Sequence, residues 1–346
     1  MHPVLLEIPL PRWNVALTGW LVVLALLALV VAALGKRAKS PDLFWAGLIG
    51  FGFALVSAVT HRGQRAEIGP VTVYSFGALL SCAVLVGAVV TARLARIEGL
   101  PARPVLNACL GAAVSGFFGA RLLYVLTNAG DFRTFGEVIA FQNGGLTFYG
   151  GAVTGALGAL WILRRHRVPF LAWADAAAPG LALSIAVGRL GCYLAGCDYG
   201  TPLSARAPAW IKRLGTFPRW PDEVAGPAAG SPAWVEHVLS GRIPLASKAS
   251  LPVHPTEIYE AAFALLLFTG LVALRRFRRF RGQAFVALVL AYGIVRFVLE
   301  SLRGDPERGL WGPLTVSQWM AVSLAIPLVL VARRSYLSGQ AGSAPT

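Results

Sequence analysis

The chain has 346 residues, of which 56% are hydrophobic and only 14% are charged. Soluble domains have about 45 to 50% apolar and about 25% charged residues, so this composition excludes an ordinary soluble protein and indicates an integral membrane protein. A formal net charge of +15 would suggest nucleic-acid binding in a soluble chain. Here the basic residues lie in short clusters between apolar stretches, which is typical of membrane-protein loops, so no nucleic-acid partner is expected.

Apolar segments of membrane-spanning length recur along the chain. A helix needs about 20 apolar residues, with a range of about 17 to 25, to cross the hydrocarbon of a bilayer. The sequence therefore predicts an all-α, polytopic membrane bundle of about nine transmembrane helices. They are expected at residues 15–34, 43–60, 71–92, 105–127, 145–163, 170–190, 256–274, 283–302 and 315–332. The first is interpreted as a span and not as a cleavable signal peptide, because basic residues follow its apolar run.

Lys and Arg are unevenly distributed between the connections. They are denser after the first, third, fifth and seventh expected spans, most of all at Arg275, Arg276, Arg278, Arg279 and Arg281. Because basic loops stay in the cytoplasm, we expect the N-terminus outside and a short cytoplasmic tail at residues 336–346. Residues 193–253 then lie outside, and their many prolines predict an arm or cap of loops and short helices between the sixth and seventh spans.

The four cysteines are too few for a disulfide scaffold and lack the paired spacing of a zinc site, so no metal ion or other cofactor is expected. Cys82 and Cys109 lie in apolar stretches and are interpreted as packing residues. Cys192 and Cys197 lie in a glycine-rich segment at the outer end of the sixth span. They are interpreted either as packing residues or as a disulfide in an oxidising compartment.

Charged residues inside spans commonly mark a site or a pathway. Arg189 lies in GRLGCYLAGCDYG at residues 188–200, where its guanidinium fork suits a lipid phosphate better than simple contact with the interface. Arg296 and Glu300 are four residues apart and would pair on one helix face, with a structural or a functional role. Asp175 has an interfacial or a functional interpretation.

Two further motifs lie where spans begin. In HPTEIYE, residues 254–260, Pro255 fits the first helical turn and Glu257 suits the positive end of the helix. His254 has a structural and a catalytic interpretation. In GGLTFYGG, residues 144–151, two glycine pairs bracket an aromatic pair, and such irregular backbone would admit a ligand if it lines a cavity.

Four motifs follow one another along the chain: GGLTFYGG, GRLGCYLAGCDYG, HPTEIYE and, at residues 296–306, RFVLESLRGDP. In this order they resemble the prolipoprotein diacylglyceryl transferase family. Residues 68–77, IGPVTVYSFG, resemble the start of the family's first helix. The resemblance predicts a seven-helix transferase core at residues 68–335 that includes the arm at 193–253. Residues 1–67 would be an N-terminal extension with two extra transmembrane helices.

The resemblance implies an enzyme of the bacterial inner membrane that transfers the diacylglyceryl group of phosphatidylglycerol to the lipobox cysteine of a prolipoprotein. A thioether forms and glycerol phosphate leaves, at an active site facing the outer leaflet and without a cofactor. The implied partners are phosphatidylglycerol, the prolipoprotein and membrane lipids. Such chemistry needs cations for the departing phosphate and a base for the thiol. By resemblance, Arg189 and Arg303 bind the phosphate, and His254 or Tyr149 assists deprotonation.

The same resemblance implies a wider set of substrate-binding residues. They are Arg121, Tyr124, Glu260, Glu300, Gly145, Gly150, Gly191 and Phe76. Asp175 also matches the family.

Three positions depart from the family pattern: Tyr149 replaces a histidine of some members, Phe76 a tyrosine, and Cys192 a frequent asparagine. A phenol, with an ordinary pKa of about 10, is a weak base unless a cation lowers that pKa, so the base stays open between Tyr149, His254 and a water molecule. The alternative functions are a non-catalytic lipid- or lipoprotein-binding homologue and a lipid or anion transporter, which would yield no covalent product.

Overall fold

The structure is a computed structural model. It describes residues 4–8, 13–37, 51, 65–68, 71–140, 144–220, 230–304 and 310–341. Two compact units are present. The larger comprises Met1–Leu5, Tyr74–Asp131 and Phe141–Thr346, and the smaller comprises Leu6–Val73 and Phe132–Ala140.

The smaller unit contains α1 (Leu17–Arg37), which covers the first expected span and ends in two basic residues. In front of it, β2 (Trp13–Ala16) pairs antiparallel with β3 (Arg65–Ile68). Three more short elements lie wholly or partly in this unit: β1 (Val4–Ile8), β4 (Val71–Tyr74) and α5 (Phe135–Val138). The span expected at residues 43–60 lies outside the described residues apart from Phe51, which is helical.

The larger unit is built from long helices. They are α3 (Ser75–Ile97), α4 (Ala102–Thr127), α6 (Phe148–Arg165), α7 (Phe170–Ala195), α11 (Thr256–Leu274), α12 (Gln283–Leu302) and α13 (Val316–Ala341). Each matches an expected span with its ends shifted by a few residues, up to nine at the C-terminal end of α13. Within the described residues, α3, α4, α7, α11 and α12 are the five helices long and apolar enough to cross a membrane. The protein is therefore a helical membrane protein.

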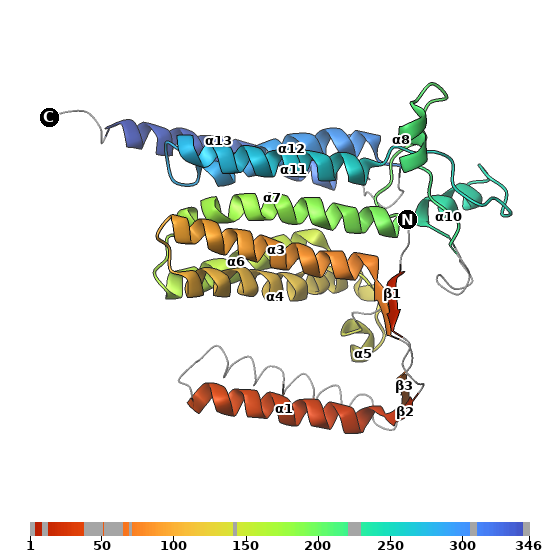
Figure 1. Cartoon of the computed structure of the whole chain (residues 1–346), viewed down its shortest axis with the longest axis horizontal. Helices are drawn as coiled ribbons and strands as arrows, with labels where there is room; N and C mark the ends of the chain where they lie inside the picture. Colours follow the sequence, from red (N-terminus) through yellow and green to blue (C-terminus); the bar gives the residue numbers. More distant parts are fainter. Residues whose placement is uncertain are drawn as a thin grey trace. The chain divides into compact units, whose positions relative to one another are not determined.

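These helices run side by side, with α3 against α7, α4 against α6, α7 against α11, and α12 against both α11 and α13 (Figure 1). Short connections join α3 to α4, α6 to α7 and α11 to α12, so the members of each pair run in opposite directions. The C-terminal ends of α7 and α12 therefore meet the N-terminal end of α11. The charged motifs of the sequence gather at this one end of the bundle.

The segment between α7 and α11 lies beyond that end of the bundle (Figure 1). Its described part has loops and the short helices α8 (Ala209–Leu214) and α10 (Pro232–Leu239), as its prolines predict. A small core of its own holds it together: Tyr199, Phe217, Ala233 and Val253. Main-chain bridges join Pro202 to Val253 and Pro218 to Ala249.

The opposite end of the bundle is held by a second group of charges. Asp175 is fully buried and accepts hydrogen bonds from the backbone N–H groups of Gly282 (2.6 Å), Ala284 (2.8 Å) and Phe285 (3.2 Å). Arg278 pairs with it at 3.3 Å. Asp175 thus satisfies the orphan N–H groups at the start of α12, which gives it a structural role in place of the interfacial one.

Gly150 lies where α6 crosses α4 closely. A Cβ atom on this residue would lie 2.3 Å from the carbonyl oxygen of Gly119 and 2.6 Å from the Cβ of Leu123. Small residues allow such approach between membrane helices. Gly150→Ala is expected to reduce the free energy of unfolding by about 1 to 3 kcal/mol, because backbone must move apart to admit the methyl group.

The measurement is thermal unfolding in detergent, followed by tryptophan fluorescence. Gly77→Ala is the matched control, since Gly77 is also helical but a Cβ there meets no described atom within 4 Å. Equal midpoints for the two variants would contradict the close α4–α6 contact.

Candidate active site

Glu260 of α11 is the centre of a buried charged network. Its side chain is 2% exposed, and its Oε1 lies 3.0 Å from Nε of Arg189 on α7. Its Oε2 lies 3.2 Å from Nη1 of Arg296 on α12. The hydroxyl of Tyr292, one helical turn before Arg296, donates to the same carboxylate. Glu260 therefore joins three helices through two guanidinium groups and one phenol.

Asp198, just beyond the end of α7, bridges two arginines in the same way. Arg189 pairs with its Oδ2, and Nη2 of Arg303 donates to its Oδ1 at 2.7 Å. Glu300 lies between Arg296 (3.1 Å) and Arg303 (3.8 Å). Asp198 is the most accessible of the carboxylates, with 30% of its side chain exposed against 2% for Glu260 and Glu300.

Main-chain hydrogen bonds fix the segment that carries Asp198. The N–H of Gly200 donates to the carbonyl of His254 (2.9 Å), and the N–H of Thr201 donates to the carbonyl of Leu302 (2.7 Å). The N–H of Gly304 donates to the carbonyl of Tyr199 (3.0 Å). The turn after α7 is thus tied both to the start of α11 and to the end of α12, which brings Arg189 and Arg303 to one carboxylate.

The pKa of Asp198 is below its ordinary value. Burial acts to raise it, but the charges of Arg189, Arg303 and Arg296 and the hydrogen bond from Arg189 outweigh burial. A carboxylate whose pKa is lower in the folded state stabilises the fold above its unfolded pKa, about 3.9, and loses this contribution as the pH falls through the folded value.

Asp198→Asn is therefore expected to lower the free energy of unfolding by about 1 to 3 kcal/mol at pH 7, since the amide carries no charge for the arginines. The difference from the unchanged protein should be constant from pH 8 to about 5 and shrink below about 4. Thermal unfolding at a series of pH values measures it. A difference that grows on acidification would contradict the assigned ion pairs.

A second group of residues that the resemblance singled out lies at the start of α6. Nη1 of Arg121, on α4, donates to the carbonyls of Gly144 (2.5 Å) and Gly145 (3.1 Å), and its guanidinium lies 5.6 Å from the ring centre of Tyr124. Gly145 has φ +77°, and a Cβ there would lie 2.4 Å from Cε1 of Tyr124. Arg121, Tyr124 and Gly145 are thus brought together, and they shape the turn before Tyr149.

Tyr149 and His254, the two residues expected to assist deprotonation, have different surroundings. Tyr149, in the first turn of α6, interacts electrostatically with Arg296, Glu300 and Arg303. Nδ1 of His254 lies 3.5 Å from the hydroxyl of Tyr259. Among the described contacts, Tyr149 and not the His254 side chain is linked to the arginines.

Gly191 and Phe76 lie where α7 meets the start of α3. A Cβ on Gly191 would lie 3.2 Å from the Cβ of Leu79 and 3.6 Å from the Cα of Phe76. Phe76 itself is 40% exposed. Gly191, like Gly150, therefore makes a helix contact.

Sequence reasoning missed Asp198 and Tyr292 as residues of the site. A signal for Tyr292 exists, because residues 292, 296 and 300 are spaced by four and share one face of α12. Asp198 has no such periodic signal, because it follows the end of α7 and its partners come from two different helices.

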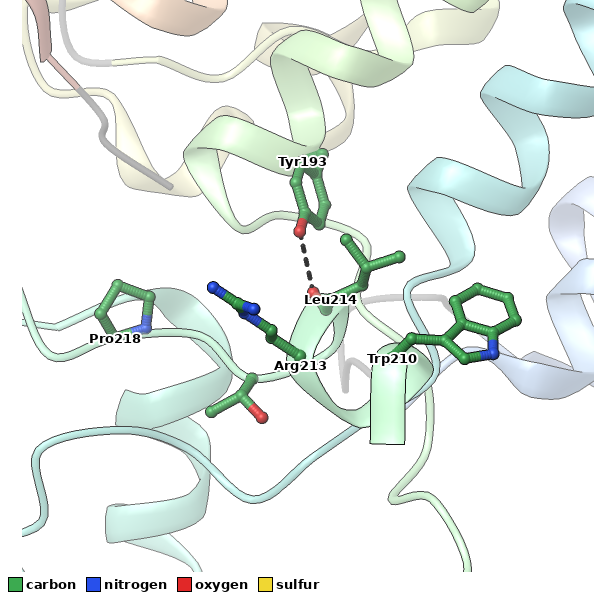
Figure 2. Close-up of a pocket in the computed structure, with 6 residues that line it drawn as sticks. Tyr193, Trp210, Arg213, Leu214 and Pro218 are labelled. Atoms are coloured by element: carbon green, nitrogen blue, oxygen red, sulfur yellow. Dashed lines mark hydrogen bonds between the residues drawn. The ribbon is translucent and has the colours of Figure 1, made fainter. Parts of the chain in front are cut away.

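A depression of about 570 Å³ lies in the segment after α7 and does not include the charged network (Figure 2). Tyr193, Trp210, Arg213, Leu214, Thr216 and Pro218 line it. The hydroxyl of Tyr193 donates to the carbonyl of Leu214 at 3.0 Å and fixes α8 against the end of α7. Trp210 is 63% exposed, so an aromatic and a basic side chain flank this depression at the surface.

The fold and the site together define a helical membrane protein with paired arginines and carboxylates at one end of its bundle. The sequence profile of the prolipoprotein diacylglyceryl transferase family matches residues 65–333. The chain belongs to this family, which confirms the resemblance drawn from its motifs.

Individual relatives cover most of both chains. A phosphatidylglycerol–prolipoprotein diacylglyceryl transferase of Thermus thermophilus is 34% identical over 275 residues, 77% of this chain and 94% of the relative. Proteins of the same name from Symbiobacterium thermophilum and Mycobacterium leprae are 29% and 30% identical, over 77% and 71% of this chain and 90% and 72% of their own lengths.

Proposed function

We propose that this chain transfers the diacylglyceryl group of phosphatidylglycerol to the cysteine thiol of a prolipoprotein, forming a thioether and releasing glycerol phosphate. Family membership supports the reaction. The observation that carries the assignment of residues is the bridge of Asp198 between Arg189 and Arg303, because it places two guanidinium groups around one anionic position.

Asp198 would act as a stand-in for the phosphate before the lipid binds. Each of its oxygens accepts from a different arginine, as two oxygens of a phosphate would. An incoming phosphate would share or replace these contacts, and the arginines would stabilise the negative charge that grows as glycerol phosphate departs. Glu260 and Glu300 would hold the guanidinium groups in place from behind.

Tyr149 is the stronger choice for the group that positions or deprotonates the thiol. It is electrostatically linked to Arg296 and Arg303, which associates its hydroxyl with the arginine site. His254 would support the site through its main chain, which pairs with Gly200 and Thr201.

In the membrane, we place the arginine site at the outer leaflet of the bacterial inner membrane. The nine-span arrangement, with the N-terminus outside and the C-terminus in the cytoplasm, puts the arginine clusters at residues 164–167 and 275–281 on the cytoplasmic side. The arm at residues 193–253 would rest on the outer surface, where exposed Trp210 (63%), Leu239 (79%) and Leu245 (67%) would meet the lipid interface. The extra spans of residues 1–67 would precede the transferase core at 68–335.

The test is mass spectrometry of a lipobox peptide incubated with the purified protein and phosphatidylglycerol. A diacylglyceryl increment on the cysteine, with release of glycerol phosphate, is expected. Tyr149→Phe should lose most of the transfer, whereas His254→Ala should retain the pH profile of the rate. Folded protein that binds the lipid and yields no increment would refute the proposal and favour a non-catalytic homologue.

A further inference from the structure

The turn at the end of α7 gathers two thiols and a carboxylate. The Sγ atoms of Cys192 and Cys197 and a carboxylate oxygen of Asp198 all lie within 4.8 Å of one another. Cys197 also contacts the carbonyl oxygen of Cys192 at 3.6 Å. In the sequence, four residues separate the two cysteines, a spacing unlike that of a zinc finger, and the fold supplies a further donor from another helix.

That donor is Glu257, in the first turn of α11. Its side chain is 1% exposed, and neither of its carboxylate oxygens has a hydrogen-bond partner in another described residue. Glu257 interacts electrostatically with Asp198, Cys192 and Cys197. Burial of a carboxylate without a partner is costly, so this position calls for a proton or a cation. The oxygens of Glu257 are not among the donors that lie within 4.8 Å of one another, so this side chain would have to move toward the thiols to bind the same ion.

We propose that Cys192, Cys197 and Asp198 bind a thiophilic divalent cation such as Zn²⁺, and that the Glu257 side chain moves to complete the site. Two sulfur and two oxygen donors make a four-coordinate set that suits zinc, whereas magnesium and calcium prefer oxygen alone. With Zn–S bonds of about 2.3 Å, tetrahedral sulfurs lie about 3.8 Å apart, so the two Sγ atoms, which lie within 4.8 Å of each other, need to approach by about 1 Å at most.

The charge balance of the site favours exchange of protons for metal. A bound divalent cation would deprotonate both thiols and release protons. The nearby guanidinium groups of Arg189 and Arg303 would offset the remaining negative charge.

Metal binding would also act on the transferase site, and this consequence depends on the proposed function. Asp198 cannot coordinate a cation and also keep both of its oxygens paired with Arg189 and Arg303. An occupied site would loosen that bridge and alter the affinity of the arginines for phosphate. The cation would therefore regulate transfer and would not take part in the chemistry.

The test uses Co²⁺ as a spectroscopic probe for the reduced, metal-free, full-length protein in detergent. Thiolate-to-cobalt charge-transfer absorption and tetrahedral d–d bands are expected at one ion per chain, and added Zn²⁺ should abolish them. The Cys192→Ser, Cys197→Ser double variant should lose these bands. The matched Cys82→Ser, Cys109→Ser double variant should keep them. Glu257→Gln should weaken Co²⁺ binding by about 10-fold to 100-fold, the range expected when a group that supports a metal site is removed.

The absence of these bands, or their persistence without Cys192 and Cys197, would overturn the proposal. So would a disulfide between the two residues that resists mild reduction, detected as a loss of two thiols reactive with maleimide after denaturation. The spectra require no turnover. A chain that binds Co²⁺ but transfers no lipid would refute the proposed function alone.

Discussion

Arg189→Ala is expected to reduce the rate of diacylglyceryl transfer by a factor of about 10² to 10³, the usual effect of removing one positioned donor from a developing anion. Arg189 is the arginine that contacts both Glu260 and Asp198. Without it, only Arg303 would face the phosphate from the Asp198 position. The measurement is the initial rate of peptide lipidation in detergent, with phosphatidylglycerol in excess.

Two further variants separate loss of chemistry from loss of fold. Arg189→Lys keeps the positive charge and loses the bidentate hydrogen bonds of the guanidinium group, so its rate should lie between those of Arg189→Ala and the unchanged protein. Arg278→Ala is the matched control at the opposite end of the bundle, where Arg278 pairs with Glu98 (3.0 Å) and Asp175 (3.3 Å). It should lower the stability and leave the rate per folded molecule nearly unchanged. Near-normal turnover of Arg189→Ala would remove this arginine from the phosphate site.

Glu260→Ala is expected to have the largest effect on stability, a loss of about 3 to 5 kcal/mol in the free energy of unfolding. The substitution leaves Arg189 and Arg296 facing each other without their common carboxylate, and Tyr292 loses its acceptor. Buried like charges then repel each other in a medium that screens them poorly. Tryptophan fluorescence during thermal unfolding in detergent measures the loss.

Glu98→Ala provides a close comparison, because Glu98 also bridges two arginines, Arg275 (3.1 Å) and Arg278 (3.0 Å). Its side chain is 13% exposed against 2% for Glu260, so water would compensate part of its removal. Glu98→Ala should therefore cost less stability and keep transfer activity. Equal losses for the two variants would contradict a special role for Glu260 at the centre of the network.

The arrangement explains how a bundle end with several arginines remains stable before the lipid arrives. Asp198, Glu260 and Glu300 face Arg189, Arg296 and Arg303, so the local charges nearly cancel. Binding a phosphate then exchanges one anion for another, which avoids exposing unpaired charge inside the protein. Asp198 is suited to this exchange because it lies on a turn and is the most exposed of the three carboxylates.

Several features follow from the sequence because they are local. A run of apolar residues of sufficient length forms a membrane helix wherever it lies, since its backbone groups must bond within the segment. The long helices of the larger unit accordingly match the expected spans, and proline excludes a long helix from the described part of the arm. The order of four motifs indicated the family, which the profile match confirms.

Even so, local patterns left some roles open. The pairing of Arg296 with Glu300 follows from their spacing on one helix, and the structure confirms it at 3.1 Å. The contact of Arg296 with Glu260 does not follow from any spacing, because Glu260 belongs to another helix. Gly150 and Gly191 were expected to bind substrate, and only the positions of the neighbouring helices reveal their close contacts with α4 and α3.

The sequence by itself determined the class of the protein, the positions of most helices and the family, and it drew attention to Arg189 and Arg303. Only the tertiary structure decided that Asp198 joins Arg189 to Arg303, and that Tyr149 rather than the His254 side chain is linked to the arginines. It also showed that the carboxylate of Glu257 is buried without a hydrogen-bond partner in another described residue. The physical reason is that hydropathy and periodicity act within one helix. Ion pairs and metal donors depend on how separate helices are rotated and where their ends meet.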